Sequence, residues 1–148
     1  MKTVRRVCSA IRLAALVTSA VTAVTADAAV QYHPREDKPF SSAVRVGDFV
    51  FVSGAGGAAA DGNLPADFAT QATNAMNLVA KELQLAGASI EDVYRCTIAL
   101  TNMDNWAAFN TVYLKYFKPN HYPVRMSIGV TSLGGAAVEV QCEAYLGK

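Results

Sequence analysis

The chain has 148 residues, of which 52% are hydrophobic, and its formal net charge is +1 at pH 7. This length fits one globular domain of modest size. The sequence has no basic patch with interleaved aromatic residues, which argues against a nucleic-acid-binding protein. Its two histidines are isolated, and no two Cys or His residues have metal-ligand spacing, which argues against a metal site and against a Ser-His-Asp or Cys-His catalytic site.

Residues 1–28 have the pattern of a secretory signal peptide. Basic residues precede an apolar run at 13–24, and Ala26-Asp27-Ala28 supplies the small residues of a cleavage site. A short membrane anchor and an unprocessed arm are the alternatives. Cleavage leaves residues 29–148 with nine Lys/Arg and eleven Asp/Glu, a net charge of −2. We therefore expect an exported, periplasmic protein with no membrane attachment after processing.

The mature chain begins with a polar segment, 29–39, which we interpret as an arm or an edge segment. Residues 43–46 and 49–52 then predict a β-hairpin, because Gly47-Asp48 between them is typical of a two-residue turn. The glycine-rich stretch 53–57 follows. It either ends the strand or exposes backbone N–H groups to a ligand, and no Gly-Lys-Ser/Thr follows it, as a phosphate loop requires.

Two amphipathic helices are predicted, with a strand over 91–100 between them. The first begins near Asp67, ends near Gly87 and has a single apolar stripe. Asp104 is the candidate cap of the second helix, whose aromatic stripe ends before Pro119. We interpret these aromatic residues as core, and Asn110 lies off their stripe.

Residues 122–131 and 138–145 predict the last two strands, joined as a hairpin about Gly134-Gly135. This register would place Arg125 and Glu139 on one face of the sheet. Burial of a guanidinium is costly, because it cannot lose its charge. The face is therefore either an open, solvated surface or a pocket or subunit interface, in which Arg125 binds a carboxylate and Glu139 acts as an acid or base.

The mature chain contains two cysteines, Cys96 and Cys142, both in predicted strands. Spacing alone does not decide whether they pair. Two separate buried thiols are the favoured interpretation, and a disulfide is the alternative.

The order of elements predicts an α+β fold with two layers, in which two helices cover one face of a mixed sheet. The second face of such a sheet is uncovered within one chain. We expect subunits to associate through it and to form ligand clefts between them.

Four segments resemble, in order, those of the RidA (reactive intermediate deaminase) family: 39–54, 61–67, 105–113 and Tyr122-Pro-Val-Arg-Met-Ser127. With the terminal Val138-Glu-Val140, the resemblance covers about residues 38 to 147. It implies a chorismate-mutase-like fold and a homotrimer with clefts between adjacent subunits. It also implies hydrolysis of short 2-imino acids and their enamine tautomers to 2-oxo acids and ammonia, without a cofactor or metal.

The resemblance also implies residue roles. Arg125 would hold the substrate carboxylate, and Glu139 would position groups or move protons around the attacked C=N bond. Ser53, the Gly54 backbone and Asn110 would line the cleft. An arginine fork suits a carboxylate, and a partly buried glutamate can move protons.

Two further cleft positions depart from the family pattern. Phe40 stands where deaminating members usually carry tyrosine, and Ser127 stands where they often carry cysteine. The expected function is that of a hydrolase similar to 2-iminobutanoate/2-iminopropanoate deaminase, acting on a small imino or enamine acid. The alternative is a non-catalytic trimer that binds small carboxylates or serves as an interaction protein.

Overall fold

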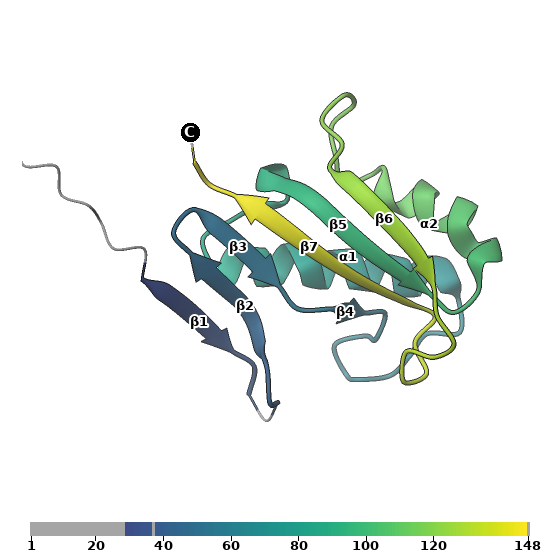
Figure 1. The fold of residues 1–148 in the computed structure, drawn as a ribbon. Helices are drawn as coiled ribbons and strands as arrows, with labels where there is room; N and C mark the ends of the chain where they lie inside the picture. Colours follow the sequence, from purple (N-terminus) through teal and green to yellow (C-terminus); the bar gives the residue numbers. More distant parts are fainter. Residues whose placement is uncertain (1–28, 37, 148) are drawn as a thin grey trace, which may run out of the picture.

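The computed structural model describes residues 29–36 and 38–147. They form a mixed β-sheet whose one face carries two helices, which confirms the predicted two-layer α+β architecture (Figure 1). The predicted signal peptide, 1–28, lies outside the described residues. Within the described part of the chain, no helix combines the length and apolar character needed to cross a membrane.

Six strands form the main sheet, and a seventh short strand, β4 (Ala55–Gly56), pairs with one of them, β7. The order across the sheet is β1 (Val30–Pro34), β2 (Ser41–Val46), β3 (Phe49–Val52), β7 (Val138–Tyr145), β5 (Val93–Leu100) and β6 (Val124–Gly129). Neighbouring strands are antiparallel except β5 and β6, which are parallel.

The first half of the sheet agrees with the sequence. β2 and β3 form the predicted hairpin, in which Val46 pairs with Phe49 and Gly47 has a φ of 58°. Such a positive φ is strained for residues with a Cβ, so glycine suits this turn. β1 pairs with β2 at the edge of the sheet, as the polar segment at the start of the mature chain allows.

Helix α1 (Phe68–Leu85) also forms as predicted. The Asp67 side chain accepts a hydrogen bond from the Thr70 N–H at 2.7 Å and satisfies an otherwise free donor of the first turn. Gly87 follows the helix with a φ of 79°, the left-handed conformation common after a helix end. The buried face of α1 packs on the sheet through residues such as Met76 and Val79.

Helix α2 (Trp106–Tyr113) differs in detail from the prediction. It ends at Tyr113, and a 3₁₀ turn at Met103–Asn105 precedes it. Asp104 is not the cap: the Asn102 side chain accepts from the Asp104 N–H at 2.9 Å and begins the 3₁₀ turn. A second 3₁₀ turn, Ile90–Asp92, precedes β5.

The predicted hairpin between β6 and β7 is wrong, because β5 lies between these strands. β5, α2 and β6 form a crossover unit, which brings two strands together in parallel. This arrangement places β5 in the interior of the sheet, where Ile98 and Leu100 are fully buried. Cys96 pairs with Arg125 on one side and with Cys142 on the other.

Cys96 and Cys142 form a disulfide, so the favoured interpretation of two separate thiols is wrong. The two residues are directly opposite each other on β5 and β7, with Cα atoms 4.1 Å apart. Both point toward the helices and are buried in the core. The sequence did not reveal this pairing, because it depends on the order and register of strands that are 46 residues apart.

Candidate functional site

The register of β5 places Arg125 and Glu139 on opposite faces of the sheet. Arg125 aligns with Cys96, whose side chain is buried beneath the helices. Glu139 alternates with the buried Val138 and Val140, so it points to the open face. The prediction that the two residues share a face is therefore wrong, and the error follows directly from the absent β6–β7 hairpin.

Arg125 lies in an aromatic hollow between α2 and the start of β6. The hollow has a volume of about 330 Å³ and is lined by Asn110, Tyr113, Leu114, Tyr122, Pro123 and Arg125. The guanidinium carbon lies 4.9 Å from the ring centre of Tyr113 and 5.9 Å from that of Trp106. Aromatic faces attract a guanidinium at these distances, so the two rings hold the charged fork beside the hollow.

Two predicted site residues accompany Arg125. Asn110 projects from α2 into the same hollow. Ser127 follows Arg125 on the same side of β6, aligned with Ile98 and half-buried. We call Asn110, Tyr113, Arg125 and Ser127 the arginine group.

Tyr113 belongs to this group, although sequence analysis assigned it to the core. The side chain is 3% exposed, and neither its hydroxyl nor the Asn110 Oδ1 has a hydrogen-bond partner among the described residues. Burial raises the pKa of Tyr113 to about 12, against the opposing charge of Arg125. The available signal was its position three residues after Asn110, on the same side of the helix.

Tyr113→Phe is expected to leave the free energy of unfolding unchanged or to raise it by about 1 kcal/mol, because it removes a buried hydroxyl that has no partner. Stability should also fall less between pH 10 and pH 12 than in the wild type. The raised pKa means that the folded state favours the neutral phenol. The stability that this preference contributes is fully present below the unfolded pKa near 10, and it is lost as pH rises toward 12. Urea unfolding across this pH range measures both effects.

Tyr116→Phe is the matched control. The Tyr116 hydroxyl donates to Asn77 Oδ1 at 2.8 Å, so its removal should lower stability by about 1 kcal/mol at neutral pH. An equal loss in Tyr113→Phe would contradict the assignment of an unpartnered hydroxyl.

The remaining predicted residues form a second group, around Glu139. Gly56 of β4 pairs with Glu139, and a Cβ added at Gly54 would overlap the Glu139 carboxylate. Glycine at position 54 therefore lets this side chain lie against the backbone. The glycine-rich stretch does more than end a strand, since it continues into β4 along β7.

Ser53, which precedes Gly54, is hydrogen-bonded to the start of β2. The Ser53 hydroxyl donates to the Ser41 carbonyl at 2.6 Å, and the Ser53 N–H donates to the Ser42 carbonyl at 3.0 Å. Phe40 immediately precedes Ser41 and is 45% exposed. We call Phe40, Ser53, Gly54 and Glu139 the glutamate group.

The two groups do not meet within one chain. The hollow at Arg125 is lined by no member of the glutamate group. Glu139 and Arg125 are on opposite faces, and the sheet places β7 and β5 between β3 and β6. Each group holds half of the chemistry expected: one has a cation suited to a carboxylate, and the other has a half-buried carboxylate suited to proton transfer.

The open face of the sheet is more apolar than the sequence predicted. Large exposed side chains stand on five of its strands: Tyr32, Phe49, Phe51, Tyr94, Val124, Met126, Ile128 and Tyr145. Glu139 and Glu143 lie among them on β7. Contiguous exposed apolar surface of this kind is typical of a protein–protein interface. The described residues contain no cluster of three potential metal ligands.

The fold is that of a small α+β protein, in which the two groups of candidate residues lie on either side of one sheet. The chain belongs to the Endoribonuclease L-PSP family, whose model matches residues 30–146. It is 31% identical over 112 residues to the 2-iminobutanoate/2-iminopropanoate deaminase of Bos taurus, covering 74% of this chain and 81% of the relative.

Two solved structures are similar throughout the fold. RidA from Psychrobacter sp. PAMC 21119 is 28% identical, with a TM-score of 0.70 and coverage of 77% of this chain and 94% of that one. TdcF of E. coli, solved with bound serine, is 28% identical, with a TM-score of 0.69 and coverage of 77% and 93%. The resemblance to RidA proteins is thereby confirmed at the level of family and fold.

Proposed function

We propose that this protein hydrolyses small 2-imino acids, and their enamine tautomers, to 2-oxo acids and ammonia. The observation that carries the proposal is Arg125, a guanidinium held by two aromatic rings at the edge of a small hollow. Its planar fork can bind both oxygens of a carboxylate. The deaminase named in Bos taurus and the serine in TdcF support a ligand of this class.

We further propose that the active form is a homotrimer with its sites between subunits. One chain carries the arginine group and the glutamate group on opposite faces, so a second subunit is needed to bring them to one ligand. The exposed apolar residues of the open face supply the surface for association.

In such a cleft, Arg125 binds the substrate carboxylate and orients the C=N bond. Glu139 takes a proton from the attacking water and passes it to the nitrogen as the C–O bond forms and the C=N double bond becomes a single bond, which gives a carbinolamine. It then takes the proton of the carbinolamine hydroxyl and delivers it to the nitrogen as the C–N bond breaks, so both protons of the water leave with ammonia. One water is consumed, and the products are the 2-oxo acid and ammonia. The Asn110 amide and the backbone at Ser53 and Gly54 align water and nitrogen.

We also propose an exported, periplasmic location for the mature chain, which two other features of the chain support. A disulfide persists in oxidising compartments and is rare in the cytosol, and Cys96–Cys142 is such a bond. The basic and apolar pattern of residues 1–28 points the same way. We place no membrane attachment or nucleic acid among the partners of the mature chain, whose net charge is −2.

The test uses purified residues 29–148 and an imine formed in place by an amino-acid oxidase. Semicarbazide traps the imine, and a deaminase suppresses the trapping by removing it. We expect suppression with short, unbranched side chains. No suppression across several side chains would support the alternative, a non-catalytic trimer that binds small carboxylates. Phe40 favours that alternative, because it lacks the phenol hydroxyl that the family resemblance usually implies at this position in deaminating members.

A further inference from the structure

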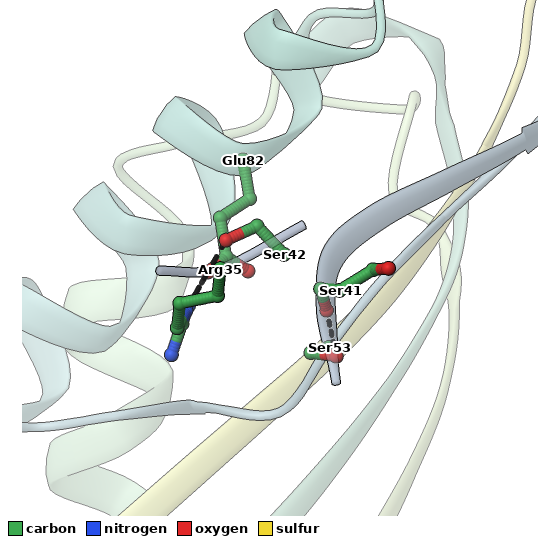
Figure 2. A network of polar contacts seen from close by, with 5 residues as sticks. All are labelled: Arg35, Ser41, Ser42, Ser53 and Glu82. Carbon is green, nitrogen blue, oxygen red and sulfur yellow. Dashed lines mark hydrogen bonds and ion pairs between the residues drawn. The ribbon is translucent and has the colours of Figure 1, made fainter. Parts of the chain in front are cut away.

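We propose that Arg35 is a positioning residue for the glutamate group, held in place by the buried carboxylate of Glu82. The inference rests on the proposed function, because it concerns the cleft in which that reaction would occur. Arg35 lies in the connection between β1 and β2, and Glu82 lies on α1 (Figure 2).

Arg35 makes four contacts with three residues. Its Nη2 forms an ion pair with Glu82 Oε1, and its Nε donates to Ser42 Oγ at 3.1 Å. The guanidinium carbon also lies 5.4 Å from the centre of the Phe40 ring. The Arg35 backbone N–H donates to the Phe40 carbonyl at 3.4 Å, so a hydrogen bond links the two ends of the β1–β2 connection. One side chain thus fixes both the ring before β2 and the second residue of β2.

Stability alone does not account for Glu82. The residue is 1% exposed and stands on the core side of α1, beside the fully buried Leu83. A carboxylate in such a place is costly, and apolar residues in place of a buried ion pair are often neutral or stabilising. Its Oε2 has no hydrogen-bond partner among the described residues. The pair therefore serves a purpose that an apolar pair would not serve.

That purpose follows from what Arg35 touches. Ser42 accepts from the Ser53 N–H, and Ser41 accepts from the Ser53 hydroxyl, so β2 holds Ser53 directly. Ser53 leads into Gly54, which packs against the Glu139 carboxylate. Arg35 therefore sets the position of Phe40 and, through β2, the backbone beside Glu139. The core-anchored Glu82 determines where Arg35 itself lies.

The test compares four variants of residues 29–148 in the imine hydrolysis assay, with thermal unfolding measured in parallel. Arg35→Met/Glu82→Leu replaces the ion pair by an apolar pair and should melt at or above the wild-type temperature. Its KM should rise about tenfold, the effect expected from losing one hydrogen bond and one cation–π contact, while kcat stays within about twofold. Arg35→Lys keeps the charge for Glu82 but loses the planar fork, so it should show the same rise in KM.

Arg45→Met is the matched control for loss of an arginine. Arg45 lies on β2, at the end of the strand far from Phe40, where it donates to the Gly47 carbonyl at 2.8 Å. Its KM should equal that of the wild type. Glu82→Leu alone, which frees Arg35, should raise KM and lower the melting temperature. A double variant with wild-type KM would overturn the proposal, because the pair would then be purely structural.

A second readout separates this inference from the proposed function. Should the wild type be inactive, the proposed reaction fails, and calorimetric binding of 2-oxobutanoate takes the place of KM. A dissociation constant about tenfold higher in the double variant than in the wild type would support the role of Arg35. Equal dissociation constants, or no binding by the wild type, would overturn it.

Discussion

Arg125→Ala is expected to lower kcat/KM for 2-imino acids by roughly a hundredfold to a thousandfold. Removing one partner of a hydrogen-bonded charge pair costs about 2 to 5 kcal/mol. Little stability should be lost, because the guanidinium's contacts within the described residues are those with Tyr113 and Trp106, worth about 0.5–1 kcal/mol each. Semicarbazide competition measures the activity, and size-exclusion chromatography tests whether the variant keeps the proposed trimer.

Arg125→Lys is the control that separates charge from geometry. Lysine keeps the positive charge but cannot present two parallel donors to a carboxylate, so it should recover only part of the loss. Unchanged kinetics in Arg125→Ala, at an unchanged size-exclusion profile, would remove the carboxylate clamp from the proposed mechanism. Equal losses on an imine that has no carboxylate would show that Arg125 acts on something other than substrate binding.

The elements that could be predicted from the sequence are those fixed by neighbouring residues. The Gly47-Asp48 turn defines the β2–β3 hairpin, and Asp67 and Gly87 mark the two ends of α1. Local signals also gave the strand that became β5. Each of these depends on turn or cap chemistry within a few residues.

Strand order could not be predicted in the same way. Whether β6 pairs with β7 or with β5 depends on the α2 crossover and on the burial of Ile98 and Leu100, which involve distant parts of the chain. The incorrect hairpin placed Arg125 and Glu139 on one face. Their assignment as candidate site residues did not depend on that hairpin alone, since residue chemistry and family resemblance both indicated them.

Tyr113 illustrates a different limit. Its spacing with Phe109 and Phe117 is that of a core stripe, and it does pack against both rings. Two properties of Tyr113 depend on the position of β6 relative to α2: the burial of its hydroxyl without a hydrogen-bond partner, and its contact with Arg125. A residue can thus belong both to the core and to a candidate site, and the helical periodicity of the sequence predicts only its place in the core.

Loss of the Cys96–Cys142 disulfide is expected to lower the free energy of unfolding by about 4 kcal/mol, on the chain-entropy relation for a closed loop of 46 residues. This is a large share of the roughly 5–15 kcal/mol that stabilises a typical domain. The bond joins β5 to β7 on the face of the sheet that packs against the helices. Loss of the bond therefore gives the unfolded chain more conformational freedom, while the packing of the native state changes little.

The measurement is urea unfolding of residues 29–148 with and without dithiothreitol, at a fixed protein concentration because association also contributes to stability. Cys96→Ala/Cys142→Ala is the control: it should unfold like the reduced wild type, apart from a small further loss from the missing sulfur atoms, and dithiothreitol should not affect it. Identical unfolding curves for the oxidised and reduced wild type would contradict a stabilising cross-link. A reduced protein that keeps its activity while unfolding at lower urea would show that the disulfide supports the fold and not the chemistry. We expect this result because neither cysteine lines the arginine hollow, although Cys96 pairs with Arg125 on the neighbouring strand.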